Sequence, residues 1–408
     1  MGEKKRKKKE KWVRLRHAVI TEAARFVLTP YVVWKYGINF EKFADQGDRP
    51  YLVLYNHQTG FDQFFVGMCF AGPVYYVATE DIFSIGWVSR LLQYAVAPIP
   101  IKKQTTDLKA VKDCAQVARE GGTIAIAPEG NRTFSGKTEY IKPSIVKMAK
   151  LLKMPIAIFR IEGGYGVQPR WSDVMRRGRM KAYVSRVIEP EEYRKLPDEE
   201  FFSMLKKELY VNEAAADQLF LHKKNAEYME RAMYVCPYCG LSEFESHDDV
   251  VECKKCGRRI QYLPSKELKG VDFEFPFRFV NDWYEYQNNF IRKLDVSPWL
   301  EKPMYRDKAR LSEVIVYKNK RPILEDAVVC LYGDRITVEG EGMEMLNFDF
   351  SRTEVVTVLG KNKLNIYYGG VIYQIKGDVR FNAVKYVNIF YKFKNTEEGN
   401  GDGESLGL

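Results

Sequence analysis

The sequence predicts an α/β domain, with a mixed sheet flanked by helices, followed by a small cysteine-bearing ribbon and a C-terminal all-β domain. Short β-rich runs alternate with helical segments between residues 50 and 190, and two Cys-x-x-Cys pairs follow. Alternating strands separated by Gly, Asp and Asn turns then fill residues 312–378. With 408 residues, 46% of them hydrophobic, the chain can bury more than one core.

The first 36 residues are predicted to form a basic arm and an amphipathic helix. Residues 1–16 hold nine Lys or Arg against two Glu, which is +7 of the chain's net charge of +10. Helical spacing places these apolar residues on one face: Trp12, Leu15, Val19, Ala23 and Phe26. Such a helix suits the interface of an anionic membrane, whereas packing on the protein's own core is the alternative reading. A basic arm alone would equally suit nucleic acid.

Cysteine usage and hydropathy indicate the compartment. The seven cysteines do not form a disulfide framework, and no stretch of 18 uncharged apolar residues exists. The charged first segment also lacks the apolar core of a secretory signal. We therefore expect a peripheral protein on the cytoplasmic face of the cell membrane.

The α/β domain is expected over residues 37–232. Its candidate strands are residues 51–55, 74–78, 96–101, 123–127 and 155–160. Between the third and fourth of these, a helix is expected with Thr106 as its N-cap, and another begins at Pro143. Residues 199–232 also look helical. The polar motifs follow strands, at the carboxyl ends where open α/β sheets usually bind ligands.

The first motif, LYNHQTGFD, places His57 in a turn and Asp62 at the start of the next helix. A carboxylate bonded to one imidazole nitrogen fixes the tautomer and leaves the other nitrogen to take a proton from a hydroxyl. The motif therefore predicts a general base. A solvated histidine beside a helix-capping aspartate is the alternative.

The second motif, IAPEGNRTFSG, gathers Glu129, Gly130 and Arg132 in a polar turn after a buried run. The planar guanidinium of Arg132 can clamp phosphate oxygens. Gly130 permits a tight backbone turn, and Glu129 is expected to orient Arg132 or the substrate. A surface ion pair is the alternative.

Together, NHQTGFD, PEGNRT and a later KMPIAIFR resemble the glycerolipid acyltransferase family, which includes the 1-acylglycerol-3-phosphate acyltransferases. The resemblance covers residues 50–190 and implies that family's fold. It implies a catalytic pair and a phosphate site, made respectively by His57 with Asp62 and by Glu129, Gly130 and Arg132. That family also has a basic residue, usually Arg, after an apolar strand. Here Lys103 is the best match and Lys102 the alternative.

The implied reaction moves an acyl group from acyl-CoA or acyl carrier protein to the free hydroxyl of 1-acylglycerol-3-phosphate (lysophosphatidate), giving phosphatidic acid. It needs no catalytic cofactor. Because a lysine lacks the bidentate geometry of arginine, glycerol-3-phosphate or another lysolipid remains an alternative acceptor. Phe61, Phe64 and Phe65 are expected either to line an acyl groove or to belong to the core.

The cysteine pairs predict a ribbon over residues 233–264. Two knuckles, CPYCG and CKKCG, contribute four thiolates: Cys236, Cys239, Cys253 and Cys256. Four thiolates suit a closed, structural zinc site. Because such ribbons also bind nucleic acid or protein, an adaptor with a degenerate enzyme domain is the rival reading. The intact motifs argue against it, and we expect no nucleic-acid partner.

The C-terminal part is predicted as an aromatic-rich connector over residues 265–305, a β domain over 306–394 and a disordered tail over 395–408. Strands followed by one helix resemble the pleckstrin-homology-like superfold, several members of which bind lipid head groups or protein segments. A turn with Lys318, Lys320 and Arg321 suits phosphate, although solvation explains it equally well.

Overall fold

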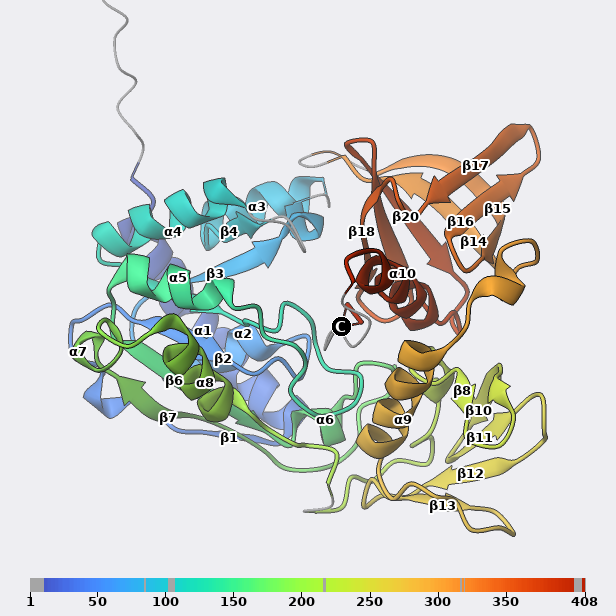
Figure 1. Ribbon diagram of the computed structural model, residues 1–408. Helices are drawn as coiled ribbons and strands as arrows, with labels where there is room; N and C mark the ends of the chain where they lie inside the picture. The colour runs from blue at the N-terminus through green and yellow to red at the C-terminus, as the bar shows by residue number, and fades with distance from the viewer. Residues whose placement is uncertain are drawn as a thin grey trace, which may run out of the picture.

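The computed structural model describes residues 11–83, 86–101, 107–215, 218–315, 318, 320–399 and 406–407. They form an N-terminal α/β domain, a small β ribbon and a C-terminal β domain (Figure 1). The α/β domain lies on one side of the molecule, and the β domain and ribbon lie on the other. The predicted fold class is confirmed.

A seven-stranded mixed sheet in the order β1-β7-β6-β2-β5-β3-β4 forms the centre of the N-terminal domain. Its strands are β1 (Ile38–Phe40), β2 (Leu52–Tyr55), β3 (Val74–Thr79), β4 (Ile99–Ile101), β5 (Thr123–Ile126), β6 (Ile156–Glu162) and β7 (Met180–Ile188). Only the β6–β7 pair is antiparallel among these neighbours. Because β2 and β5 are parallel neighbours, the loops after them meet at one edge of the sheet.

Helices cover both faces of this sheet. They are α1 (Leu15–Tyr36), α2 (Asp62–Cys69), α3 (Trp87–Ala95), α4 (Leu108–Arg119), α5 (Ser144–Leu152), α6 (Gly164–Val167), α7 (Pro190–Tyr193) and α8 (Asp198–Leu209), with short 3-10 turns η1 (Ala44–Gln46) and η2 (Glu80–Phe83). Apolar side chains of α4, α5 and α8 form one core cluster with the sheet, whereas α1 and α2 contribute to a second cluster. The central strands β2 and β5 therefore read as nearly continuous apolar runs, because both of their faces are buried.

Several details differ from the sequence-based expectation. All five predicted strands are present, but β1 and β7 were not predicted. The N-cap of α4 is Asp107, whose carboxylate accepts from two backbone N–H groups, whereas Thr106 lies outside the described residues. The helix expected over residues 199–232 ends at Leu209. Beyond it, backbone groups bond to distant segments, as Glu213 N–H does to Gly136 at 2.7 Å, so no helical ladder continues.

The inward side of helix α1 carries polar residues as well as the buried Val32 and Tyr36. His17 is buried, and its Nδ1 lies 3.1 Å from the hydroxyl of Tyr75. The guanidinium of Arg25 donates to the carbonyls of Gly67 and Gly72 at 2.6 Å each. Polar bonds thus hold α1 against α2 and β3.

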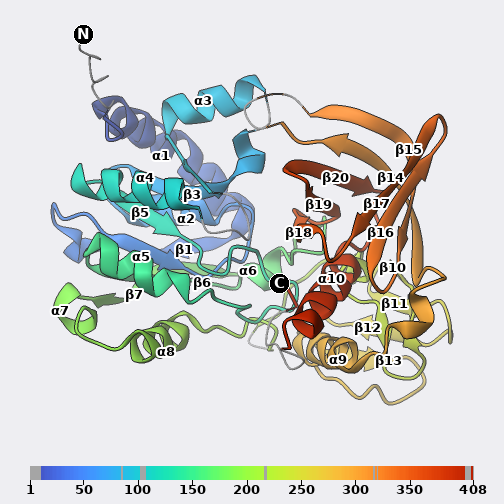
Figure 2. The same cartoon turned by 45° about the horizontal axis from the view of Figure 1, so that its top comes forward.

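The apolar side of α1 faces outward, beside α3 (Figure 2). We call these exposed residues the α1–α3 surface: Leu15, Val19, Phe26, Val27, Tyr31 and Trp34 of α1, with Trp87, Leu91 and Tyr94 of α3. Phe26 is 86% exposed and Trp34 is 80% exposed. Trp12, expected on this face, instead precedes the helix and donates its indole N–H to Ala97 at 3.0 Å. Among the described helices, α1 included, none has the length and apolar composition to cross a bilayer.

The ribbon and the helix after it share one core with the β domain. The ribbon holds β8 (Val235–Cys236), β9 (Gly240–Leu241), β10 (Phe244–His247), β11 (Val250–Cys253), β12 (Arg259–Tyr262) and β13 (Leu268–Gly270), preceded by η3 (Met229–Arg231). The expected connector contains α9 (Val280–Lys293) and η4 (Ser297–Trp299). Trp283 of α9 donates its indole N–H to Val235 at 2.9 Å, which joins α9 to the first knuckle.

The β domain is a seven-stranded antiparallel sheet in the order β17-β16-β15-β14-β20-β19-β18, closed by a helix. Its elements are β14 (Tyr305–Glu313), β15 (Arg321–Leu331), β16 (Arg335–Gly340), β17 (Met343–Asp349), β18 (Thr353–Leu359), β19 (Lys363–Tyr368), β20 (Val371–Gly377) and α10 (Val384–Glu397). In the predicted basic turn, Lys320 donates to Gln374 at 2.6 Å and Arg321 pairs with Glu313.

The described part of the C-terminal tail is ordered, which differs from the expected disorder over residues 395–408. Helix α10 continues to Glu397. Leu406 is 3% exposed within the core, and its carbonyl accepts from Asn388 of α10 at 2.9 Å. Burial of this apolar side chain holds the segment down.

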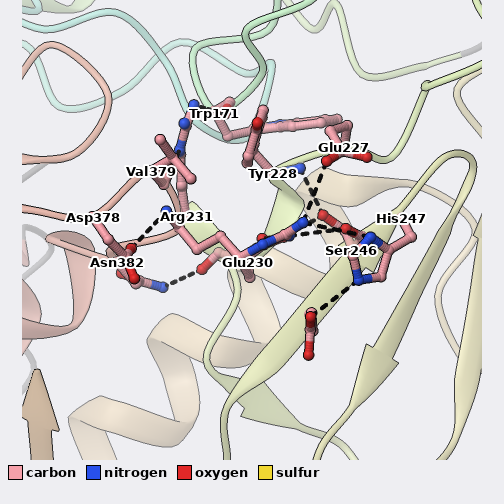
Figure 3. Close-up of polar contacts among 12 residues, drawn as sticks. Trp171, Glu227, Tyr228, Glu230, Arg231, Ser246, His247, Asp378, Val379 and Asn382 are labelled. Carbon is pink, nitrogen blue, oxygen red and sulfur yellow. Dashed lines mark hydrogen bonds and ion pairs between the residues drawn. The ribbon is translucent and has the colours of Figure 1, made fainter.

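Polar contacts join the three units where η3 leads into the ribbon (Figure 3). Arg231 is 2% exposed, and its guanidinium donates to the carbonyl of Trp171 in the N-terminal domain at 2.9 Å and to the carbonyl of Val379 before α10. Asn382 donates to the carbonyl of Glu230 at 2.8 Å. These bonds fix the β domain against the sheet that carries both motifs.

Candidate active site

His57 and Asp62 meet at the carboxyl end of β2, as the first motif predicts. His57 Nδ1 lies 2.7 Å from Asp62 Oδ2. Because a carboxylate accepts this bond, Nδ1 carries the hydrogen and the lone pair lies on Nε2. His57 lines a cavity, so this nitrogen is available to a substrate.

The carboxylate of Asp62 is fully buried and held by the turn that precedes it. It accepts from the backbone N–H of Gln58 at 2.6 Å, from that of Thr59 at 2.9 Å and from the Thr59 hydroxyl at 2.7 Å. These bonds fix its orientation toward the imidazole. Burial lowers the pKa of His57 below its usual value, although Asp62 opposes this shift. The ring is therefore neutral near pH 7, as a general base must be.

Glu129 joins the two motif loops through backbone groups. Its carboxylate accepts from the N–H of His57 at 3.0 Å and from the N–H of Glu139 at 2.9 Å. Burial raises the pKa of Glu129 to about 8. The expectation that Glu129 orients Arg132 is not met by these contacts. Glu129 instead positions the backbone of the proposed base.

Arg132 lies in the cavity wall beside this pair. Gly130 has φ +69°, a left-handed conformation that turns the loop after β5. Within the described part of the chain, no carboxylate lies at ion-pair distance from the Arg132 guanidinium. Lys103, the second expected phosphate ligand, and its alternative Lys102 lie outside the described residues. Ile101, which directly precedes them, lines the cavity.

A cavity of about 970 Å³ connects these polar groups with an apolar interior. Its lining comes from the two motif loops and from several helices, including Leu28 and Val32 of α1, Phe64 and Met68 of α2, Val111 of α4 and Met148 and Leu151 of α5. This volume is near the upper end of the roughly 300–1,000 Å³ usual for small-molecule sites. Of the three phenylalanines considered for an acyl groove, Phe64 lines the cavity, whereas Phe65 is fully buried core.

Comparison with known proteins agrees with the two motifs. Residues 37–161 match the family model described as Acyltransferase, a range that includes both motif loops. Residues 37–161 of this chain are therefore similar to that family. No curated protein sequence matches the chain. Among solved structures, the 1-acyl-sn-glycerophosphate (LPA) acyltransferase PlsC from Thermotoga maritima is similar, with 17% identity, a TM-score of 0.40 and coverage of 47% of this chain and 78% of that chain.

The four cysteines of the ribbon form a second site, separate from the two motif loops. The sulfur atoms of Cys236, Cys239, Cys253 and Cys256 all lie within 4.8 Å of one another, so the group can hold a metal ion. Two of the sulfur pairs are 3.8 and 3.5 Å apart. Tetrahedral zinc with bonds of about 2.3 Å places its sulfur ligands at about this separation.

Sequence reasoning missed Arg170, which also lines the cavity of the N-terminal domain. It follows α6 in an irregular segment and is 2% exposed. No motif or spacing relates it to His57 or Arg132. The sequence shows only an arginine in a segment without a helix or strand pattern, and that is not a signal by itself.

Proposed function

We propose that this protein is a 1-acylglycerol-3-phosphate O-acyltransferase, which converts lysophosphatidate to phosphatidic acid. The observation that carries the proposal is the His57–Asp62 pair at 2.7 Å, in a cavity that also contains Arg132 and a large apolar lining. The neutral base suits the acceptor hydroxyl, the cation suits its phosphate, and the apolar part of the cavity suits an acyl chain.

The proposed reaction is a direct transfer. Nε2 of His57 takes the proton of the acceptor hydroxyl while the hydroxyl oxygen attacks the carbonyl carbon of the acyl thioester. The C–S bond then breaks, the acyl ester remains on the acceptor, and the thiolate takes the proton back from His57. Asp62 stabilises the transient imidazolium through the bond to Nδ1. Arg132 holds the acceptor phosphate, with Lys103 as its expected second ligand, so that the hydroxyl lies near His57.

The donor is proposed to be acyl-CoA or acyl carrier protein, both of which carry the acyl group as a thioester. His57 supplies the proton transfer in either case, so the mechanism calls for no catalytic cofactor. The ribbon is proposed to hold structural zinc, because its four sulfurs leave no ligand position for a substrate.

We further propose that the protein works at the cytoplasmic face of the cell membrane. The exposed α1–α3 surface is apolar, and the basic residues 1–16 precede it. An apolar face beside a basic segment favours an anionic bilayer interface. The exposure of Phe26 and Trp34 supports this proposal over the alternative, in which the predicted apolar face packs on the protein's own core.

The test is product analysis with the purified full-length protein. Given lysophosphatidate in vesicles and either thioester donor, we expect mass spectrometry to detect phosphatidic acid. His57→Ala should lose about 10²–10⁴-fold in rate, because the general base is missing. The control is His222→Ala, a histidine outside the cavity lining.

Two results would contradict the proposal. One is an undiminished rate in His57→Ala. The other is transfer to glycerol-3-phosphate or a different lysolipid with none to lysophosphatidate, which would keep the reaction type and replace the acceptor.

A further inference from the structure

Arg170 is a buried cation in the cavity wall that belongs to neither motif. Its Nη1 donates to the carbonyl of Arg132 at 2.7 Å, and its guanidinium lies 4.2 Å from the ring centre of Phe134. Its side chain is therefore held against the same loop that carries the proposed phosphate ligand.

The β domain supplies the other half of the support for Arg170. Nε donates to the carbonyl of Gly360 at 2.8 Å, and Nη2 donates to the carbonyl of Val358 at 3.3 Å. Both carbonyls belong to β18 and the turn that follows it. Leu359 and Gly360 also line the cavity, so this turn forms part of its wall.

The same turn is anchored to the N-terminal domain by an ion pair. Lys361 Nζ lies 2.7 Å from one carboxylate oxygen of Asp173, and Arg231 lies 2.8 Å from the other. Although burial alone would raise the pKa of Asp173, these two cations lower it to about 2. Asp173 is thus charged at neutral pH. It links Arg231, which precedes the ribbon, to Lys361 in the turn after β18.

The charges around Arg170 indicate an anionic ligand. Among the residues that the structure describes, neither Arg170 nor Arg132 has a carboxylate at ion-pair distance. Burial and, next, the neighbouring Arg132 lower the pKa of Arg170 to about 9. Asp62 acts on Arg132, and Glu139 acts on Arg170, only from beyond ion-pair distance. An anion that pairs directly with the buried Arg170 therefore offsets the cost of burying its charge.

We propose that Arg170 is a second phosphate-binding residue and that the β domain completes this pocket by holding Arg170 through the turn after β18. The ligand chemistry is a phosphate monoester, either inorganic phosphate or a glycerolipid headgroup. Lys361 is a positioning residue, because it anchors the turn and does not line the cavity. Only the identification of the headgroup as lysophosphatidate rests on the proposed function.

The first experiment measures phosphate binding without turnover. Calorimetry of the full-length protein is run with inorganic phosphate and with glycerol-3-phosphate. For both ligands, the affinity of Arg170→Gln should be lower than that of the wild type by about tenfold or more, because a charge-assisted bond is lost. Lys361→Gln should weaken binding a few-fold and Lys361→Arg should restore it. The control is Lys376→Gln, which removes an equal charge from an exposed position of β20.

Phosphate affinity that is equal in wild type and Arg170→Gln would overturn the proposal, as would the absence of binding to wild type. If Arg170→Gln fails to fold, the Lys361 series decides. Unchanged phosphate affinity in Lys361→Gln then overturns the role of the β domain.

The second experiment separates headgroup recognition from a general structural effect. Acyl transfer to lysophosphatidate is compared with transfer to the phosphate-free monoacylglycerol. In Arg170→Gln and Lys361→Gln, KM for lysophosphatidate should rise while the constants for monoacylglycerol change little. Equal losses for both acceptors would contradict recognition by Arg170. Absence of transfer by wild type would refute the proposed function while leaving the calorimetric result to decide on the phosphate site.

Discussion

The hydrogen bond from His57 to Asp62 decides which imidazole nitrogen is left for proton transfer. The sequence predicted this pair because a turn brings residues five positions apart together. It could not predict that Glu129 would bond to the backbone of His57, because that contact joins residues 72 positions apart through two parallel strands. Arg170 escaped prediction for the same reason, since its partners lie in the loop after β5 and in the distant β domain.

The pKa of His57 leads to a prediction for Asp62→Asn. Activity of the wild type should rise with pH as His57 loses its proton, with an apparent pKa below 6.5, and should then be level. Asp62 raises the pKa of His57, so its neutralisation should move this acid limb to lower pH. The level rate should fall about 10²–10⁴-fold because the tautomer and the imidazolium lose support. Rate profiles from pH 4 to 8 measure both effects, and a limb moved to higher pH would contradict the assignment.

At the scale of elements, α1 shows what periodicity can and cannot reveal. The spacing of Leu15, Val19 and Phe26 correctly predicted a helix with an apolar face. It could not say whether that face was covered, because the decision depends on bonds such as those of Arg25 to the segment around α2. The central strands of the sheet were easier to predict, since strands buried on both faces are continuous apolar runs, whereas β7, which has polar and exposed positions, was missed.

Membrane attachment through α1 can be tested with Phe26→Ser/Trp34→Ser. Both side chains are almost fully exposed, so the double variant should fold normally. Its affinity for anionic vesicles in a sedimentation assay should fall by about 100-fold or more, because burial of each aromatic side chain stabilises binding by about 1.5–3 kcal/mol. Wild-type binding should weaken as salt rises, since salt screens the basic arm.

The matched control is Met345→Ser, which removes an exposed apolar side chain from β17 of the β domain. Undiminished sedimentation of the double variant would place attachment elsewhere. If DNA displaces the protein from vesicles and vesicles do not displace the protein from DNA, a nucleic-acid role for the arm is favoured instead.

On the scale of the whole molecule, the ribbon is a structural link in a shared core. Its cysteine spacing alone predicted the cluster, whereas the joint packing of ribbon, α9 and β domain was not predictable. That packing depends on contacts between segments far apart in sequence, such as Tyr234 with Asn388 at 2.7 Å. The relative placement of domains carries no local sequence signal.

Loss of the metal should therefore lower the stability of the molecule without directly altering acyl transfer. We expect one zinc per chain in the wild type and none in Cys253→Ala, with a loss of about 3 kcal/mol or more. In a unit of this size that lowers Tm by roughly 6–12 °C. Metal analysis and calorimetry measure both quantities. Cys330→Ala, which removes another buried thiol, should keep the metal; zinc-free wild-type protein would contradict the assignment.

Helix α1 alone separates the outer surface of the molecule from part of the cavity. Phe26 and Trp34 face outward, whereas Leu28 and Val32 line the cavity on the other side of the same helix. If the outer side rests on lipid, an acceptor can pass sideways from the leaflet into the chamber without crossing bulk water. Turnover should then obey two-dimensional kinetics. Diluting lysophosphatidate with inert lipid inside each vesicle should slow the reaction, whereas adding buffer to vesicles with fully bound enzyme should not.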